Sequence, residues 1–327
     1  MGQSWRKSGA ILMAGMVMAL GSSSGRAEDK KPAEKKKMNV VFAIDVSGSM
    51  DHIIEAAQKK VWAIVNDLMK AKPTPDLRVG LIAYHGENEA LFDAVGFKIW
   101  DLTDDLDTMY KNLMSLHTIG GNRECVGRAM YEAVHTVKWD KGADVMKTLF
   151  IMGNEPADQD TNQKEYGFKV VAPQAIANGI IVNTVYCQQG QGLVERGWEE
   201  IAKLSEGVFT TIGLEGRVTA VATPFDKDLT ELNGKLNQTF IGYGARGRDA
   251  MMLQARMDST AEAQGAPMAA ERAVTKAGAA YKTASWDLVK GLQEGQVAMK
   301  DLKNEELPEP MQKMNEKERE TYVKQKS

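Results

Sequence analysis

Apolar residues in this chain follow two patterns, short continuous runs and longer stretches with helical spacing. The first run, Val40–Ile44, is continuously apolar, which is typical of a strand buried on both faces of a sheet. After it, apolar residues from Ile54 to Leu68 recur every three or four positions and predict a helix that ends before Pro73. Strand-like runs and helical stretches then alternate as far as about residue 215.

The later elements of this alternation follow from the same two patterns. Further strands are expected at Leu77–Tyr84, Ala94–Trp100, Thr148–Met152, Ile180–Tyr186 and Val208–Thr211. Further helices are expected from a cap at Thr103 to Leu116 and at Cys125–Val137, Gln163–Asn178 and Trp198–Ser205. A polar loop joins the second and third strands, so we expect these two to form a hairpin. The alternation predicts an α/β domain over residues 38–215, with a doubly wound, mostly parallel sheet covered by helices on both faces.

Residues 216–327 have helical spacing and predict a helical C-terminal region. One apolar stripe comprises Leu229, Leu232, Leu236, Phe240 and Tyr243, and a second comprises Leu288, Leu292, Gly295, Met299 and Leu302. We expect this region to pack partly on the α/β domain and to be partly extended. After Pro308 the chain is strongly charged, which indicates a frayed or disordered end.

The first residues have the pattern of a secretory signal. Arg6 and Lys7 precede a short apolar stretch that ends at Leu20, and Gly25 and Ala27 are small residues suited to cleavage after Ala27. We therefore expect residues 1–27 to be a signal peptide, because the apolar stretch is too short to cross a bilayer. Residues 28–37 follow as a charged leader. No later run is long and apolar enough to span a membrane, so we expect a periplasmic or secreted protein.

Composition and charge exclude several classes of function. The 327 residues suggest about two domains, and a net charge of −3 gives no electrostatic footprint for a nucleic-acid partner. Neither a G-x-x-x-x-G-K-[ST] phosphate loop nor a G-x-S-x-G nucleophile elbow is present, and we expect the protein not to be an enzyme. The sequence leaves open whether the two cysteines, Cys125 and Cys187, form a disulfide or stay as buried thiols.

The segment Asp45-Val46-Ser47-Gly48-Ser49-Met50 lies where the first buried strand turns into a helix. In a doubly wound sheet, ligands collect at the carboxyl ends of the strands. Asp45, Ser47 and Ser49 are spaced so that a carboxylate and two hydroxyls can converge on one point. Oxygen donors select a hard divalent ion, Mg²⁺ or else Mn²⁺ or Ca²⁺. The alternative, a serine that merely caps the following helix, is less favoured in this strand–loop–helix context.

These residues resemble the metal-ion-dependent adhesion site of von Willebrand factor type A (VWA) domains. The resemblance covers about residues 38–215, and the stretches Leu77–Leu113 and 180–209 are similar to those of bacterial extracytoplasmic members. It implies an open α/β sheet with one antiparallel edge strand. It also implies that a second loop with a Thr or Asp and a third loop with an Asp share the cation with the D-x-S-x-S loop.

The second and third loops depart from the family pattern. The position of the family threonine falls on Asn122 when counted from Gly120-Gly121, and on Glu124 when counted back from Gly127. Asn154 occupies the place of the third-loop aspartate, and its amide brings a carbonyl oxygen without charge. The ion would therefore be held less tightly. Asp158 and Asp160 lie a few residues further on and could compensate for the missing charge, but as loop carboxylates they are rather expected to be solvated.

Two functions remain from the sequence. In the first, an extracytoplasmic binding module engages a protein ligand, whose acidic side chain completes the shell of the weakly bound cation. In the second, a structural or assembly protein makes its contacts through the helical C-terminal region, and the metal site is degenerate.

Overall fold

The computed structural model describes residues 35–86, 97–120, 124–188, 192–212 and 223–327. The expected signal peptide and most of the charged leader lie outside the described residues. The chain divides into two compact units after Lys35, and every described helix and strand belongs to the second unit, Lys36–Ser327. Within the described ranges, no helix has both the length and the apolarity needed to cross a membrane.

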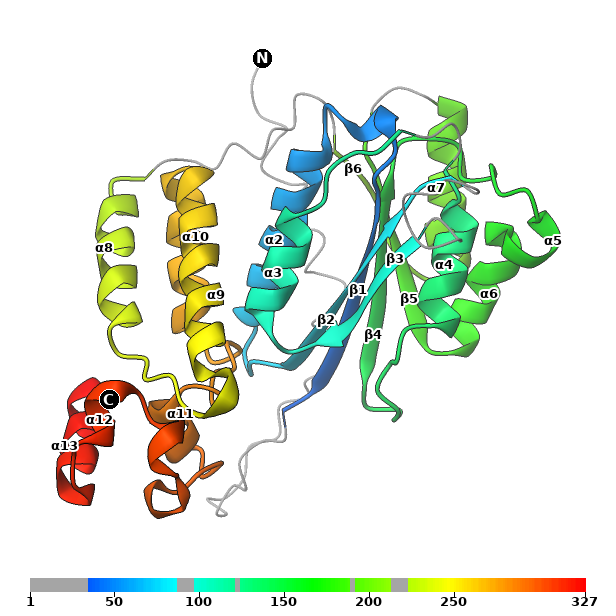
Figure 1. Cartoon of the computed structure of the whole chain (residues 1–327). Helices are drawn as coiled ribbons and strands as arrows, with labels where there is room; N and C mark the ends of the chain where they lie inside the picture. The colour runs from blue at the N-terminus through cyan, green and yellow to red at the C-terminus, as the bar shows by residue number, and fades with distance from the viewer. Residues whose placement is uncertain (1–34, 87–96, 121–123, 189–191, 213–222) are drawn as a thin grey trace, which may run out of the picture. The chain divides into compact units, whose positions relative to one another are not determined.

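The core of the molecule is a six-stranded sheet with the order β3-β2-β1-β4-β5-β6 (Figure 1). The strands are β1 (Lys37–Asp45), β2 (Asp76–Tyr84), β3 (Phe97–Thr103), β4 (Met146–Gly153), β5 (Ile180–Tyr186) and β6 (Phe209–Thr211). All neighbouring pairs are parallel except β2 and β3, which are antiparallel. The predicted fold class, a mostly parallel sheet with one antiparallel edge strand, is confirmed.

Helices cover both faces of this sheet. The strand β1 is buried on both sides, because Val40 and Phe42 belong to one apolar core while Val41 and Ala43 belong to the other. The helices α2 (Ile54–Met69) and α3 (Leu106–Met114) complete the first core. The helices α4 (Val126–His135), α6 (Phe168–Ala177) and α7 (Gly192–Leu204) complete the second. This two-sided burial explains the continuous apolar run that marks β1 in the sequence.

The strand order places one end of the sheet in a favourable position for a ligand. From β1 the chain proceeds outward to β2 and β3 on one side, and then returns to β4, β5 and β6 on the other. The order therefore reverses between β1 and β4, and the loops that follow these two strands diverge at their carboxyl ends. Such a switch point is the usual ligand-binding place in an open α/β sheet.

Two local details of this domain differ from the sequence-based expectation. The cap of α3 is Asp105, which accepts a hydrogen bond from the Thr108 amide at 3.0 Å, and not Thr103. The helix expected over 163–178 is divided at Gly167, whose extended ψ of 131° separates α5 (Gln163–Tyr166) from α6.

The C-terminal region is helical, as predicted, and comprises α8 (Asp226–Asn237), α9 (Gly244–Ala263), α10 (Ala266–Ala277), α11 (Leu288–Gln293), α12 (Glu309–Gln312), α13 (Glu316–Lys326) and the short 3₁₀ turns η2 (Met299–Asp301) and η3 (Asn304–Glu306). Neither of the two predicted apolar stripes lies within a single helix. The first stripe continues past the end of α8. The second is broken at Gly295, whose φ of +69° takes the backbone out of the right-handed helical region.

The end of the chain differs from the expectation of a frayed or disordered terminus. Helix α13 begins with a reciprocal cap, in which the Asn315 side chain accepts from the Glu318 amide and the Glu318 carboxylate accepts from the Asn315 amide. Val323 is buried in a small cluster with Met311 and Leu307. A buried valine and a capping box thus help to hold a helix in which seven of the eleven residues are charged.

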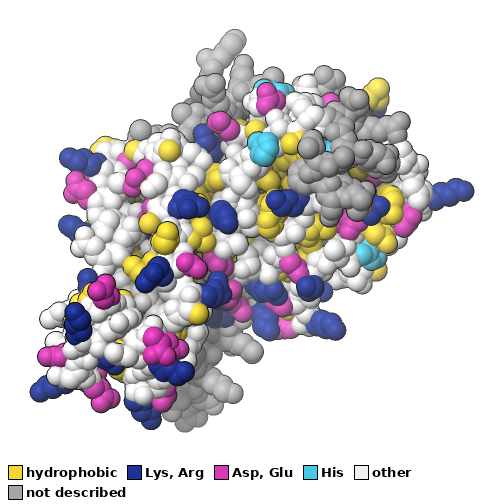
Figure 2. All heavy atoms as spheres, in the orientation of Figure 1, with side chains coloured by type: hydrophobic (Ala, Val, Ile, Leu, Met, Phe, Trp, Pro, Cys, Tyr) yellow, Lys and Arg dark blue, Asp and Glu magenta, His cyan; other side chains and the backbone are white. Residues whose placement is uncertain are grey.

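Buried charges join the C-terminal helices to the α/β domain. Arg272 of α10 is completely buried and pairs with Asp107 of α3 and with Asp258 of α9. Lys276, one turn further along α10, also pairs with Asp258. Elsewhere, basic and acidic side chains are interspersed on the face that Figure 2 shows. The C-terminal helices therefore belong to the same folded unit as the sheet.

Candidate metal site

Asp45 is the last residue of β1 and lies completely buried at the switch point of the sheet. Its Oδ1 atom accepts a hydrogen bond of 2.8 Å from the Ser47 amide. Its Oδ2 atom is buried and has no hydrogen-bond partner among the described residues. Burial raises the pKa of Asp45 to about 8, with a smaller contribution from the nearby Glu124 carboxylate. A buried carboxylate oxygen without a partner is costly unless a cation neutralises it.

Ser47, Ser49 and Asn154 form a connected set of oxygens beside this carboxylate. The two serine hydroxyls are 2.9 Å apart, and the Ser49 hydroxyl donates to Asn154 Oδ1 at 2.9 Å. The Asn154 Nδ2 amide in turn donates to the Ser49 carbonyl at 3.2 Å. This second bond requires an amide, because a carboxylate has no hydrogen to donate. Asparagine thus ties the third loop to the first loop from both ends of its side chain.

The serines do not act as helix caps. Ser47 precedes the short 3₁₀ helix η1 (Gly48–Met50), but its side chain makes no capping hydrogen bond. Helix α2 begins only at Ile54. The hydroxyls of this loop are therefore directed to each other and to Asn154 rather than to the helix that follows.

Glu124 is the second-loop residue that approaches this set. It is buried, and its amide is held by a 2.9 Å hydrogen bond to Gln159 Oε1. Burial raises the pKa of Glu124 to about 7, while a hydrogen bond with Ser47 lowers it. Of the two alternatives for this loop, Glu124 is near the first loop, whereas Asn122 lies outside the described residues.

Gly153 ends β4 and sets the distance between the first and third loops. A Cβ atom at this position would lie 2.7 Å from Tyr84 Oη and 3.2 Å from Asp45 Cβ. The first of these is closer than side chains tolerate, and Tyr84 is itself fixed by a 2.9 Å hydrogen bond to the Met152 carbonyl. The absence of a side chain at Gly153 lets the third loop approach the carboxylate.

Asp158 and Asp160 take different roles. Asp158 is exposed, as expected for a loop carboxylate. The expectation is wrong for Asp160, which is buried and accepts hydrogen bonds of 2.9 Å from the Gly127 and Arg128 amides. These amides belong to the first turn of α4, so Asp160 satisfies the helix end and complements its dipole. Sequence reasoning missed this role because the two segments are more than 30 residues apart.

Cys125 and Cys187 are both buried, and no disulfide joins them. Burial raises the pKa of Cys187 well above its usual range, so that its thiol stays protonated. Of the two alternatives that the sequence leaves open, the structure has the buried thiols.

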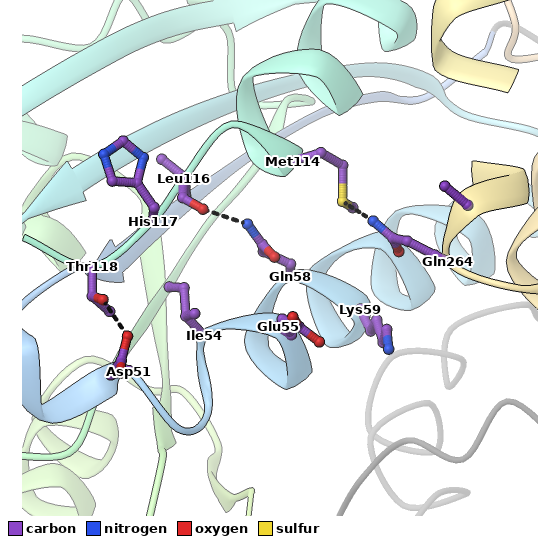
Figure 3. A pocket seen from close by; sticks show the side chains of 11 residues that line it. Asp51, Ile54, Glu55, Gln58, Lys59, Met114, Leu116, His117, Thr118 and Gln264 are labelled. Atoms are coloured by element: carbon purple, nitrogen blue, oxygen red, sulfur yellow. Dashed lines mark hydrogen bonds between the residues drawn. The ribbon is translucent and has the colours of Figure 1, made fainter. Parts of the chain in front are cut away.

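A hollow of about 600 Å³ lies beside the first and second loops (Figure 3). On its wall, Thr118 donates a 2.7 Å hydrogen bond to Asp51 Oδ1. Gln58 donates from Nε2 to the carbonyls of Leu113 and Leu116, both at 2.9 Å. These bonds hold the second loop against the start of α2.

The residues that are present fit a hard divalent cation. The donors are the Asp45 carboxylate, two hydroxyls, an amide oxygen and the neighbouring Glu124 carboxylate, all of them oxygens. Among the described residues, no three His, Cys, Asp or Glu side chains gather into a metal-binding group. The arrangement is thus a candidate cation site with few charges, in which Asp45 Oδ2 is the atom that most needs a positive partner.

The solved structures that this chain resembles include a matrix protein and a pilus adhesin. Proximal thread matrix protein 1 from the mussel byssus has a TM-score of 0.43 at 14% identity, over 65% of this chain and 61% of its own. A structure of it with a zinc-occupied MIDAS motif has a TM-score of 0.41 at 13% identity, over 55% and 43%. The pilus adhesin SpaC from Lactobacillus rhamnosus GG has a TM-score of 0.42 at 12% identity, over 57% and 29%. The chain spans less than two thirds of each, and likeness at this identity concerns the fold alone.

The sequence itself gives a clearer relationship. A search of curated proteins finds no match. The family model of the von Willebrand factor type A domain, however, matches residues 39–218, more than half of the chain. The matched residues include the sheet, except for the first two residues of β1, and all three loops of the candidate metal site. The chain therefore belongs to the von Willebrand factor type A domain family.

Proposed function

We propose that the protein is an extracytoplasmic binding module that engages a protein ligand through a divalent cation at Asp45, Ser47 and Ser49. The observation that carries this proposal is the Asp45 Oδ2 atom, which is buried beside a set of neutral oxygens and has no hydrogen-bond partner in the part of the chain that the structure describes. Asn154 and Glu124 complete the set of candidate ligands, and Asn122 is retained as an alternative from the second loop. Export is supported by the signal-like residues 1–27.

Some residues of the site provide charge for a cation, and others hold the loops in position. Asp45 would supply a fully buried negative charge when a cation takes the place of its proton, and its Oδ1 atom is fixed by the Ser47 amide. Ser49 and Asn154 hold the first and third loops together through two hydrogen bonds. A bound Mg²⁺, Mn²⁺ or Ca²⁺ would supply a positive centre with an unfilled coordination position, suited to an acidic side chain of a protein partner.

Titration calorimetry with Mg²⁺ and Mn²⁺ tests the metal assignment. We expect the Asp45→Ala variant to lose cation binding, because the carboxylate is the main charge of the site. The matched control is Asp158→Ala, which removes a carboxylate of the third-loop segment that is exposed to solvent. Circular dichroism checks that both variants are folded. Cation affinity that is unchanged in Asp45→Ala, or reduced equally in both variants, would reject the assignment.

The second candidate function, assembly through the helical C-terminal region, makes the opposite prediction about chelation. A pull-down from the native envelope fraction should lose the partner in EDTA if the cation mediates binding, and keep it if the C-terminal helices do. Deletion of residues 216–327 is a poor discriminator, because it removes Arg272 and leaves the buried Asp107 without its cation. Point substitutions on the exposed surface of the C-terminal helices avoid this defect.

A further inference from the structure

Helix α8 buries polar side chains against the protein and leaves apolar side chains exposed to solvent. The only residues of α8 that are buried are Asp226 and Asn233, both of them polar. Leu232 is 55% exposed, and Phe225, at the start of the helix, is 67% exposed. A helix on the surface of a soluble protein normally does the reverse and buries its apolar stripe.

Hydrogen bonds explain why the polar side faces inward. Asn233 and Asn237 both donate to Asp258 Oδ2 of α9, at 3.2 and 2.7 Å. Lys276 of α10 donates to Asn237 and to Asp258. These side chains extend the buried ion cluster around Arg272, so rotating α8 to bury its leucines would leave Asp258 with fewer partners. The orientation of α8 is fixed by this cluster.

A stripe of apolar residues runs along the helix, in which the exposed Phe225 and Leu232 alternate with the partly buried Leu229 and Leu236. Phe225, Leu229, Leu232 and Leu236 follow each other at steps of four, three and four residues, which places them on one face. Figure 1 shows α8 beside α10, at the outer side of the C-terminal helices. Val274 of α10 is 43% exposed and lines a hollow of about 240 Å³ together with Leu229. The apolar surface thus extends from α8 onto α10.

The charges at the margin of the stripe indicate what covers it. Asp228 and Lys235 are exposed, lie two turns apart, and make no ion pair among the described residues. When two copies of α8 pack antiparallel about a twofold axis near Leu232, Asp228 of each copy faces Lys235 of the other, and Leu229 lies opposite Leu236. In a parallel arrangement the two copies of Asp228 would lie on opposite flanks of the interface, and neither would face Lys235 of the other copy. The stripe is therefore complementary to itself in one orientation.

We propose that α8 is a self-association surface, through which two copies of this chain pair antiparallel along Phe225, Leu229, Leu232 and Leu236. The interface is isologous and is flanked by two symmetric Asp228–Lys235 pairs. It involves no residue of the metal site, so association does not depend on a divalent cation.

Sedimentation equilibrium of the purified chain over a wide concentration range, in Mg²⁺ and in EDTA, tests this proposal. We expect a concentration-dependent dimer under both conditions, and an association constant at least tenfold lower in Leu232→Glu. The matched control is Leu193→Glu, which places the same charge at an apolar residue of α7 that is 80% exposed. Circular dichroism melting identifies any variant that fails to fold. A wild-type chain that is monomeric at every concentration overturns the proposal and means that another partner covers the stripe. A dimer that Leu232→Glu does not weaken overturns it too.

Charge exchange tests the orientation independently. We expect Asp228→Lys and Lys235→Asp each to weaken the dimer several-fold, because each places like charges opposite one another. The double variant Asp228→Lys/Lys235→Asp restores complementarity and should recover the wild-type association constant. Single variants without effect, or a double variant weaker than both, overturn the antiparallel pairing.

Discussion

Replacing Arg272 by methionine tests whether the buried ion cluster holds the C-terminal helices on the α/β domain. The guanidinium is fully buried and contacts carboxylates of two other helices, Asp107 of α3 and Asp258 of α9. Methionine fills much of the same space but leaves Asp107 without a cation. The Tyr281 hydroxyl, which donates to Asp107 at 2.5 Å, would then be its only close partner among the described residues.

The size of the expected loss follows from the burial of these groups. Removing one partner of a buried ion pair typically costs about 3–5 kcal/mol, because the remaining charge stays desolvated and unpaired. At about 2–4 °C per kcal/mol for a domain of this size, the Tm should fall by about 6–20 °C. The matched control is Lys138→Met. Lys138 is 86% exposed and pairs with Asp101 at 3.5 Å, and such surface pairs contribute about 0–1 kcal/mol.

Urea unfolding followed by circular dichroism measures both variants. The double variant Arg272→Met/Asp107→Leu should regain part of the stability lost in Arg272→Met, because it removes the stranded carboxylate as well as its partner. The reasoning fails if Arg272→Met is no less stable than Lys138→Met. It also fails if the double variant loses as much as the two single variants together, since that would mean that the residues do not act as a pair.

Two further predictions concern single carboxylates. Asp160→Ala should lower the free energy of unfolding by about 1–2 kcal/mol, because α4 loses its cap. The control Asp158→Ala should change it by less than about 0.5 kcal/mol. Equal losses of the two variants in urea unfolding would contradict the capping role. Burial would raise the pKa of Asp258, but Lys276 and Arg272 hold it below its ordinary value, so its ionised form stabilises the fold above a pH of about 4. The stability gap between the wild type and Asp258→Asn should be constant above about pH 5 and narrow as the pH falls toward 3; a gap that widens on acidification would contradict this sign.

The elements of the sheet could be predicted because their signals are local. The strand β1 is apolar at every position from Val40 to Ile44, since both of its faces are buried. The helix expected from Ile54 ends one residue beyond the last apolar residue of its pattern. The predicted helix bounds were wrong where the backbone conformation of a single residue interrupts the apolar periodicity. Gly167 and Gly295 each end a helix that the apolar pattern alone would continue.

The candidate site could be predicted only in part. Asp45, Ser47 and Ser49 lie within five residues, so a single loop suffices to bring them together. Asn154 and Glu124 lie near the Asp45 loop because of the order of the strands in the sheet. They were predicted from the family resemblance and not from their spacing in the sequence. Nothing in the sequence indicated that Asp160 would turn to the end of α4.

The sequence by itself determined the α/β core and the loop chemistry at the end of β1, because apolar periodicity and close spacing are properties of neighbouring residues. Only the tertiary structure decided that the polar side of α8 faces the protein and that the charged α13 is an ordered helix. An apolar stripe has the same period whether it faces a core or solvent. Its direction depends on partners that are distant along the chain, and for α8 those partners are the buried charges of Asp258 and Lys276.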